Sequence, residues 1–152
     1  MTASWHPGTD EASFHGIKWL SYAPNMAATD AARRAGYDDA LLLTTAGDVL
    51  EGPTFTVAWV ADGAVETPGM EMGILASITR EVLLESCARL GRPVREGRFP
   101  LSRLLAADEV MALSTTKEVT PIAELGEHRL GSGPVASELA AVHRAIVSEE
   151  LG

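Results

Sequence analysis

Two kinds of hydrophobic pattern alternate along this chain. Apolar positions at helical spacing, or alanine-rich segments bounded by Pro and Gly, predict helices over residues 21–35, 77–90, 101–107 and 134–151. Short apolar runs of the strand type lie between them, within residues 39–45, 49–51, 54–61, 64–67, 94–99, 110–113 and 119–122. Interleaved strands and helices place the chain in the α/β or α+β class.

Turn and cap residues mark where these elements end. Asp62-Gly63 is a hairpin signal between two apolar runs, Ser77 is a suitable N-cap for the second helix, and Gly91 ends that helix. Residues 1–12 are polar and contain Pro and Gly, so we interpret them as a flexible tail. Residues 13–152 then form one domain, because 152 residues is the length of a single ordinary domain.

Charge and composition argue against several classes of partner. The net charge is −9 and the Lys and Arg residues do not cluster, which disfavours nucleic acids and anionic membrane surfaces. No apolar run reaches the ~18 residues of a membrane span, and the N-terminus lacks the pattern of a signal peptide. Cys87 is the only cysteine, and the four histidines lack metal-ligand spacing. We therefore expect a cytoplasmic protein with no metal site.

Four short stretches contain residues that could do chemistry. In SFHGIKWLSY, Lys18 lies between apolar neighbours, where an amine could attack a carbonyl. In VLEGPT, Glu51 follows an apolar strand and could face a cation. MGILASITRE leads into a helix, whose first N–H groups can bind an anion, and ALSTTKEV offers three consecutive hydroxyls.

Each stretch taken alone also has an ordinary explanation, and that explanation is favoured. A lysine such as Lys18 usually extends its ammonium into water. Glu51 is interpreted as an exposed turn acid, Ser77 explains the helix start without a ligand, and residues 114–116 can satisfy their own turn.

Other polar residues are interpreted in the same way. Asp38, Asp39 and Glu109 are expected to be solvated acids at strand ends, and His143 is expected on the solvent side of the last helix. Cys87 fits the buried face of its helix better than a role as a nucleophile.

The order of the four stretches resembles the class IV aminotransferases, the pyridoxal-phosphate enzymes of fold type IV. These include branched-chain and D-amino-acid aminotransferases and aminodeoxychorismate lyase. The resemblance implies the family's large C-terminal domain, a mixed sheet or pseudo-barrel flanked by helices. The matching segments, which lie within about residues 14–122, are GIKWLSYAPNMAA, GYDDALLLTTAGDVLEGPT, TPGMEMGILASITRE and DEVMALSTTKEVTPI.

The resemblance also implies roles for two reactive side chains. Lys18 would attach pyridoxal 5′-phosphate (PLP) covalently and move the proton between Cα of the substrate and C4′ of the cofactor. Glu51 would pair with the protonated pyridine nitrogen and keep the ring cationic.

The remaining implied roles concern the rim of the cofactor. Ile78 and Thr79 would bind the phosphate through backbone N–H groups, and Thr115 would add a hydroxyl. Thr116 matches a position whose backbone faces the substrate carboxylate, and Tyr22 matches a position near the hydroxyl group of the cofactor ring.

The chain departs from the family pattern in two places. Phe55-Thr56 stands where many relatives have Ser-Asn or Ser-Ser, so a large ring would alter local hydrogen bonding at the cofactor. Only 17 residues precede Lys18, and we therefore expect the family's small N-terminal domain, which completes the substrate pocket, to be missing from this sequence. A homodimer, or a separate chain that supplies the small domain, is expected to complete the site.

The resemblance implies transamination between an amino acid and a keto acid, or elimination from aminodeoxychorismate. The alternative is a catalytically impaired remnant, or one subunit of a split enzyme, that serves as a dimerisation or partner-binding domain.

Overall fold

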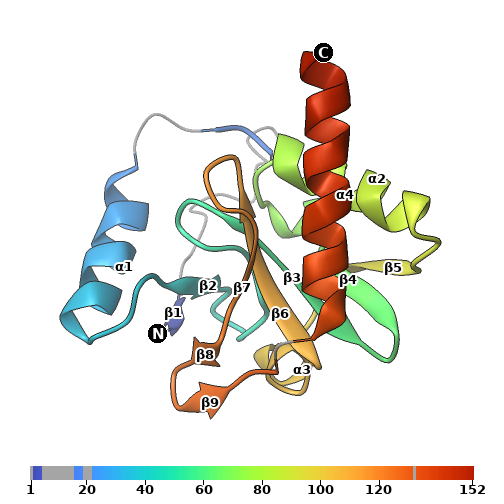
Figure 1. The fold of residues 1–152 in the computed structure, drawn as a ribbon. Helices are drawn as coiled ribbons and strands as arrows, with labels where there is room; N and C mark the ends of the chain where they lie inside the picture. Colours follow the sequence, from blue (N-terminus) through green and yellow to red (C-terminus); the bar gives the residue numbers. More distant parts are fainter. Residues whose placement is uncertain (1, 5–15, 19–21, 132) are drawn as a thin grey trace.

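A computed structural model describes residues 2–4, 16–18, 22–131 and 133–152 of the chain. At its centre is a five-stranded mixed sheet with the strand order β5-β4-β3-β6-β7 (Figure 1). β3 pairs antiparallel with both β4 and β6, β6 pairs antiparallel with β7, and β4 pairs parallel with β5. The strands are β3 (Thr56–Ala61), β4 (Ala64–Pro68), β5 (Val94–Gly97), β6 (Glu109–Ser114) and β7 (Glu118–Pro121).

Two short strand pairs lie outside this sheet. β1 (Thr2–Ser4) runs parallel to β2 (Leu41–Leu43), and β8 (Glu124–Leu125) pairs antiparallel with β9 (His128–Arg129). The prediction of a flexible tail over residues 1–12 is wrong for Thr2–Ser4, because β2 has a free edge whose backbone groups these three residues pair. Residues 5–12 lie outside the described part of the chain.

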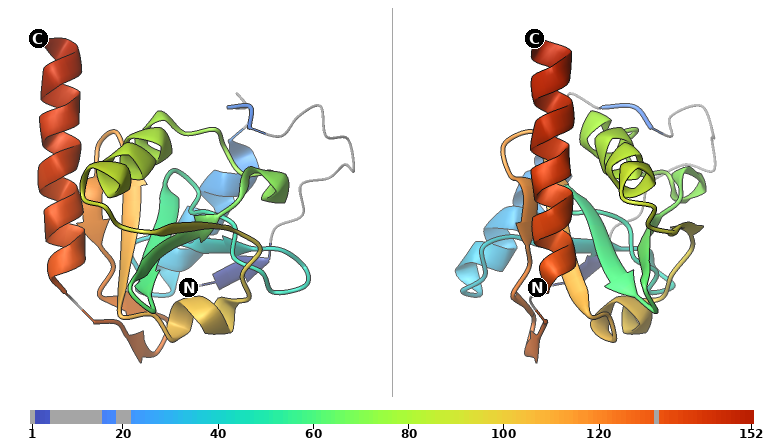
Figure 2. Two further views of the ribbon diagram at one scale, coloured as in Figure 1. Left: turned by 90° about the vertical axis from the view of Figure 1, so that its right-hand side faces the viewer. Right: turned by 45° about the vertical axis from the view of Figure 1, so that its right-hand side comes forward.

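The helices fall on both sides of the sheet. They are α1 (Ala23–Arg34), the 3₁₀ turn η2 (Met70–Met72), α2 (Ile78–Arg89), α3 (Leu101–Leu105) and α4 (Pro134–Leu151). α2 and α4 pack against each other and against β6. Figure 2 shows α4 standing along the β7 side of the sheet and extending past the rest of the domain. No helix among the described residues has both the length and the apolar character needed to cross a bilayer.

Each face of the sheet has its own hydrophobic core. Alternate residues of a strand point to opposite faces, so Ala58 and Val60 of β3 pack under α2 and α4, whereas Val57 and Trp59 pack toward β2, α3 and β8. All six residues of β3 are buried as a result. This explains why the central strand is an unbroken apolar run, which is the pattern of a strand covered on both faces.

The fold class is therefore confirmed, and the four predicted helices are present with ends within two residues of the predicted ones. Three of the expectations about single polar residues are wrong. Glu109 is buried and accepts hydrogen bonds from the backbone N–H groups of Val135 (3.1 Å) and Ala136 (2.8 Å), where it caps α4 from a distant strand. Asp39 is half-buried and accepts hydrogen bonds from Thr29 Oγ1 and from the backbone N–H of Ala40.

The third is His143, which is buried on α4 rather than facing solvent. Burial lowers the pKa of its imidazole, which favours the neutral ring. The strand β7 packs closely against α4. This contact buries the face of the helix that the sequence pattern predicted to be exposed to solvent.

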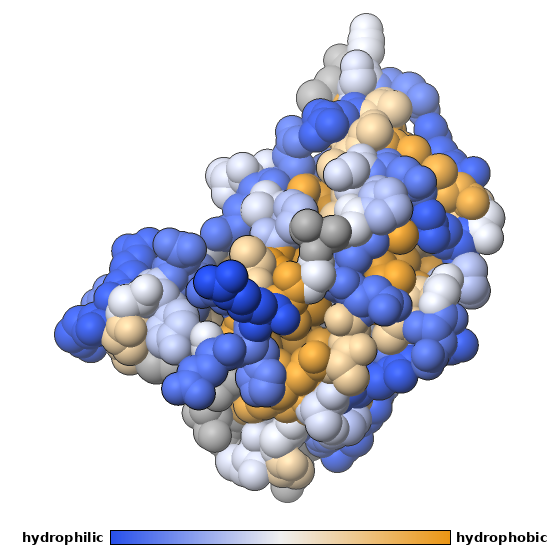
Figure 3. Space-filling model, turned by 60° about the horizontal axis from the view of Figure 1, so that its bottom comes forward, coloured by the Kyte–Doolittle hydropathy of each residue, from blue (hydrophilic) through white to orange (hydrophobic). Residues whose placement is uncertain are grey.

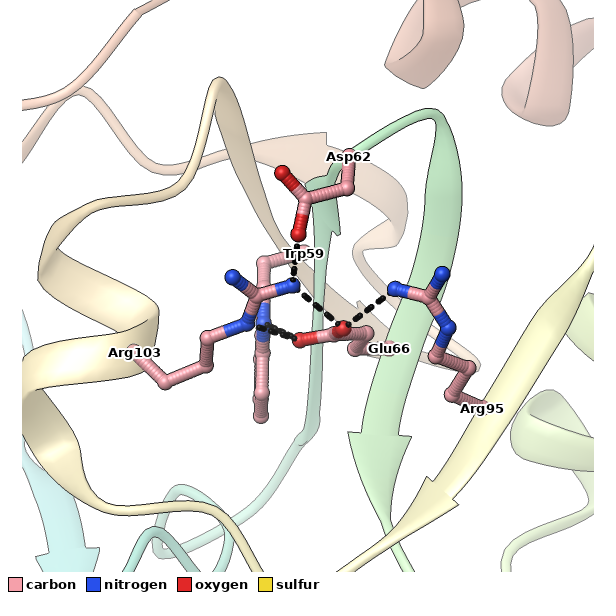
Figure 4. A network of polar contacts seen from close by, with 5 residues as sticks. All are labelled: Trp59, Asp62, Glu66, Arg95 and Arg103. Atoms are coloured by element: carbon pink, nitrogen blue, oxygen red, sulfur yellow. Dashed lines mark hydrogen bonds and ion pairs between the residues drawn. The ribbon is translucent and has the colours of Figure 1, made fainter.

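A buried polar network connects β3, β4, β5 and α3 (Figure 4). Glu66 of β4 is only 1% exposed and accepts hydrogen bonds from Trp59 Nε1 (2.8 Å), from Arg95 (3.1 Å) and from two nitrogens of Arg103 (2.9 and 2.8 Å). Arg103 also donates to Asp62 (2.7 Å) in the hairpin turn. The two arginines neutralise the two carboxylates, so the buried charge of Glu66 is compensated.

Candidate active site

Glu51 lies at the end of a segment that folds back on β2. The backbone N–H of Leu42 donates to the carbonyl of Glu51 (2.8 Å), and the N–H of Leu50 donates to the carbonyl of Leu42 (3.0 Å). The side chain of Glu51 is half-buried, and its carboxylate accepts a hydrogen bond from the backbone N–H of Leu75 (3.3 and 3.4 Å to its two oxygens). Burial raises the pKa of Glu51 to about 7. Glu51 is thus a desolvated carboxyl group, not an exposed turn acid.

Lys18 follows a backbone segment that is hydrogen-bonded to residues 75 and 76, the segment that also contacts Glu51. Gly16 forms a parallel bridge with Leu75, and the N–H of Ala76 donates to the carbonyl of Gly16 (3.2 Å). The two residues before Gly16 lie outside the described part of the chain. Gly16 has φ +80°, and a Cβ there would lie 3.3 Å from both Ala76 Cβ and Met70 Cε. The side chain of Lys18 itself is exposed.

The segment that holds Glu51 and Gly16 leads directly into α2. Ser77 is the N-cap residue, but its side chain makes no capping hydrogen bond within the described residues. The prediction that the Ser77 hydroxyl caps this helix is therefore wrong, and the first N–H groups of α2 have no side-chain acceptor there. Ile78 is 77% exposed, whereas Thr79 is buried.

Tyr22 lies at the start of α1. It is half-buried, and its carbonyl accepts the N–H of Met26 (2.9 Å). One turn along, Asn25 Nδ2 donates to the carbonyl of Pro53 (2.8 Å), which joins the first turn of α1 to the turn after Glu51.

Thr115 and Thr116 occupy the turn between β6 and β7. Ser114 Oγ accepts the N–H of Lys117 (3.1 Å) and lies 3.4 Å from Thr116 Oγ1, so part of this hydroxyl group satisfies its own turn, as the ordinary explanation predicted. Thr115 is exposed. The turn lies beside Phe55, because Lys117 Nζ is 5.5 Å from the centre of the Phe55 ring.

Phe55 packs on the glycine that follows Glu51. A Cβ built on Gly52 would lie 2.1 Å from Phe55 Cε1, and the ring is almost completely buried. The large ring at this departure from the family pattern is thus accommodated because residue 52 has no side chain.

Several contacts link positions 51–53 to the backbone segments that carry other predicted residues. Leu75 and Ala76 connect Glu51 to the segment before Lys18 and to the start of α2. Asn25 connects the turn to the helix that begins beside Tyr22, and Phe55 connects it to the turn of Thr115 and Thr116. Backbone contacts of Leu75 and Ala76 therefore join the desolvated carboxyl group of Glu51, the backbone two residues before Lys18 and the segment that leads into α2.

Sequence reasoning missed the residues that make these connections. Leu75 and Ala76 make their contacts through backbone N–H groups, which every residue except proline has, so the identity of these residues does not reveal the contacts. Asn25 could have been found, because a polar amide in the first turn of a helix often bonds to a neighbouring segment.

Phe55 also lines a cavity of about 370 Å³. It is lined by part of the second hydrophobic core, including Leu41, Val57 and Val110, with Lys117 among its polar residues. Apolar side chains also gather in a hollow on the underside of the molecule (Figure 3). The described lining includes none of the predicted site residues, but Phe55, which packs on Gly52, borders it.

Replacing Glu51 with glutamine is expected to stabilise the cofactor-free domain above pH 7. Because the folded-state pKa of Glu51 is raised from 4.5 to about 7, the folded state binds more protons than the unfolded state between those values, and stability falls as the pH rises through them. Glu51→Gln would keep an acceptor for the Leu75 N–H without that loss. We expect a gain of about 1–3 kcal/mol at pH 8 and little change at pH 4, measured by urea unfolding. An equal effect at both pH values would contradict the explanation by desolvation.

The sequence of this chain matches a known protein family over most of its length. The model of the family described as Amino-transferase class IV matches residues 1–125. The chain belongs to the class IV aminotransferase family. Class IV aminotransferases depend on PLP.

Individual relatives agree with this assignment. The chain is 32% identical over 95% of its length to a "Probable branched-chain-amino-acid aminotransferase" of Synechocystis sp., of which it covers 48%, and 33% identical over 82% of its length to the aminodeoxychorismate lyase of Bacillus subtilis, of which it covers 42%. The PLP-form structure of the branched-chain amino acid aminotransferase from Thermobaculum terrenum superimposes with a TM-score of 0.89 at 33% identity, covering 97% of this chain and 50% of that one. This class IV chain spans about half the length of the relatives it matches.

Proposed function

We propose that this domain binds PLP and supplies the catalytic lysine of a class IV enzyme that acts on an amino acid. The observation that supports this most directly is the double contact made by residues 75 and 76. Leu75 binds the desolvated carboxylate of Glu51, and Ala76 binds the backbone two residues before Lys18. In the proposed site, this short segment would hold the two side chains that such a cofactor needs at opposite ends of its ring.

The proposed role of Glu51 follows from its burial. When bound, PLP withdraws electrons from Cα of the amino acid, and it does so best with a protonated ring nitrogen. A carboxyl group with a pKa of about 7 in the unliganded protein becomes ionised beside a cationic partner. Glu51 would therefore hold the proton at the ring nitrogen, and Lys18 would move the proton at Cα.

The proposed phosphate site is the start of α2. The N–H groups of Ile78 and Thr79 would bind the phosphate, since the Ser77 side chain does not cap them in the described structure. The exposed hydroxyl of Thr115 would add a further hydrogen bond. Thr116 would face the substrate carboxylate, and Tyr22 would lie near the ring hydroxyl.

Transamination between an amino acid and a keto acid is the reaction that we propose first, with elimination from aminodeoxychorismate as the second candidate. Relatives of both kinds match at similar identity. Ile17 (52% exposed) and Ile78 (77% exposed) place bare apolar surface beside the proposed site. We propose that further protein covers it, either a second copy in a homodimer or a small domain on a separate chain.

Covalent trapping tests the proposal. The chain contains only two lysines, Lys18 and Lys117. We expect the purified protein, incubated with PLP and reduced with borohydride, to have the pyridoxyl group on Lys18, located by peptide mass spectrometry. Labelling that is divided evenly between Lys18 and Lys117, or that does not saturate with PLP, would overturn the proposed function.

A further inference from the structure

Arg80 is a buried cation in the first turn of α2. Its side chain is 5% exposed, and its Nη2 donates to the carbonyl of Pro68 (3.3 Å) and to the carboxylate of Glu96, with which it forms an ion pair. Pro68 is the last residue of β4, and Glu96 lies in β5, the parallel neighbour of β4. Arg80 therefore attaches the start of α2 to two strands of the central sheet.

These contacts close a loop. The chain leaves the sheet after Pro68, passes through η2, and returns as residues 73–77 to the start of α2. Arg80 lies just after the end of this loop and binds its beginning. The loop includes Leu75 and Ala76, which bind Glu51 and the backbone of Gly16. One guanidinium thus restrains both ends of the segment on which the spacing of the proposed site depends.

The arrangement of Arg80 is not optimal for stability alone. Its Nε is buried without a hydrogen-bond partner among the described residues, and an unsatisfied buried donor is unfavourable. Its counterion Glu96 is 44% exposed, so the ion pair is shared between a buried group and a solvated one. These contacts are therefore expected to stabilise the domain less than a fully satisfied buried ion pair would, and the position of Arg80 between β4, β5 and the loop of residues 69–77 is what distinguishes it.

We propose that Arg80 is a positioning residue that fixes residues 69–77 and, through Leu75 and Ala76, sets the geometry of Glu51, the Lys18 segment and the start of α2. This inference rests on the proposed function in so far as that geometry serves PLP. Arg80 acts through the loop and does not itself contact the reacting atoms.

Arg92 offers a matched control. It lies just beyond the other end of α2, pairs with the carboxylate of Glu138, and also has a buried Nε without a partner among the described residues. Arg92→Met therefore removes an arginine, an ion pair and an unsatisfied donor, as Arg80→Met does, but at a place remote from residues 69–77.

The first readout is amide hydrogen exchange of the cofactor-free protein. We expect Arg80→Met to speed exchange in residues 69–77 roughly tenfold or more relative to wild type, because the loop loses the contact that joins its ends. Arg92→Met should lower the Tm by a similar amount but leave exchange in residues 69–77 unchanged. Arg80→Lys, which keeps the positive charge on a shorter side chain, should fall between. If Arg80→Met does not fold, Glu96→Gln removes the exposed partner instead and should speed exchange in the same segment.

The second readout compares PLP with pyridoxal, which lacks the phosphate. We expect Arg80→Met to weaken PLP about 10- to 100-fold, since displacements near 1 Å at a binding site have effects of this order, and to weaken pyridoxal less. A variant that merely loses stability would change both affinities alike. Equal behaviour of Arg80→Met and Arg92→Met in both readouts would overturn the inference. Failure of the wild-type protein to bind PLP would overturn the proposed function instead, and the exchange result would still decide the role of Arg80.

Discussion

Replacing Lys18 with alanine is expected to abolish covalent attachment of PLP and to lower the rate of amino transfer by at least about 10³-fold. The lysine would supply both the amine that attaches the cofactor and the base that moves the Cα proton, and general acid–base catalysis alone contributes about 10²–10⁴-fold. Attachment is measured by the absorbance of the protein after gel filtration, and transfer by the production of the keto acid in the presence of whatever chain completes the site.

Lys117 is the control for this experiment. It is exposed, it lies over the Phe55 ring, and it is the only other lysine in the chain. Lys117→Ala should retain covalent attachment. Noncovalent binding of PLP to Lys18→Ala should persist, because the proposed phosphate site at α2 does not involve the lysine side chain. If Lys18→Ala still forms the covalent product while Lys117→Ala does not, the assignment of the catalytic lysine is wrong.

Replacing Glu66 with glutamine is expected to destabilise the domain by about 1.5–3 kcal/mol, the range for hydrogen bonds to a charged group, because the arginines left behind are 52% and 31% exposed and remain solvated. The amide of the Glu66→Gln variant could still accept the hydrogen bond of Trp59. The variant would leave Arg95 and Arg103 without the buried carboxylate that balances them. The free energy of unfolding in urea at pH 7 measures the effect.

Acid should weaken the contribution of Glu66. Hydrogen bonds from Arg103 lower its pKa below the usual 4.5. The folded state therefore binds fewer protons than the unfolded state as the pH falls below about 4.5, and the stabilisation disappears as the pH passes the lowered folded-state pKa. The difference between wild type and Glu66→Gln should narrow over that range. Asp62→Asn is the control, because Asp62 is 70% exposed and its ion pair with Arg103 should contribute only about 0–1 kcal/mol. A change below about 1 kcal/mol for Glu66→Gln would show that the network is not needed for stability.

The fold could largely be predicted from the sequence because its main elements follow local rules. The hairpin at Asp62-Gly63 and the two-faced burial of β3 follow from turn chemistry and from an apolar run. β8 and β9 were missed, since two-residue strands have no periodicity to detect.

The polar interior could not be predicted, because each partner comes from a distant part of the sequence. Glu109 looked like a solvated acid until α4 placed its first N–H groups against it, 26 residues away. Glu66 sits in a strand whose other polar residues gave no indication of two arginines 29 and 37 residues further on. For the same reason Lys18, Glu51 and Ile78 could be linked only through a family resemblance.

Gly16 restricts how this domain could be joined to a different N-terminal partner. Its φ of +80° would strain any residue with a side chain, and a Cβ 3.3 Å from Ala76 Cβ and Met70 Cε would require these neighbours to shift. A chimaera that replaces the upstream region must therefore keep the native chain from Gly16 onward. A junction placed at Ile17 or Lys18 would bring in a residue with a Cβ at position 16, and it would shift the lysine even if the new domain folded correctly.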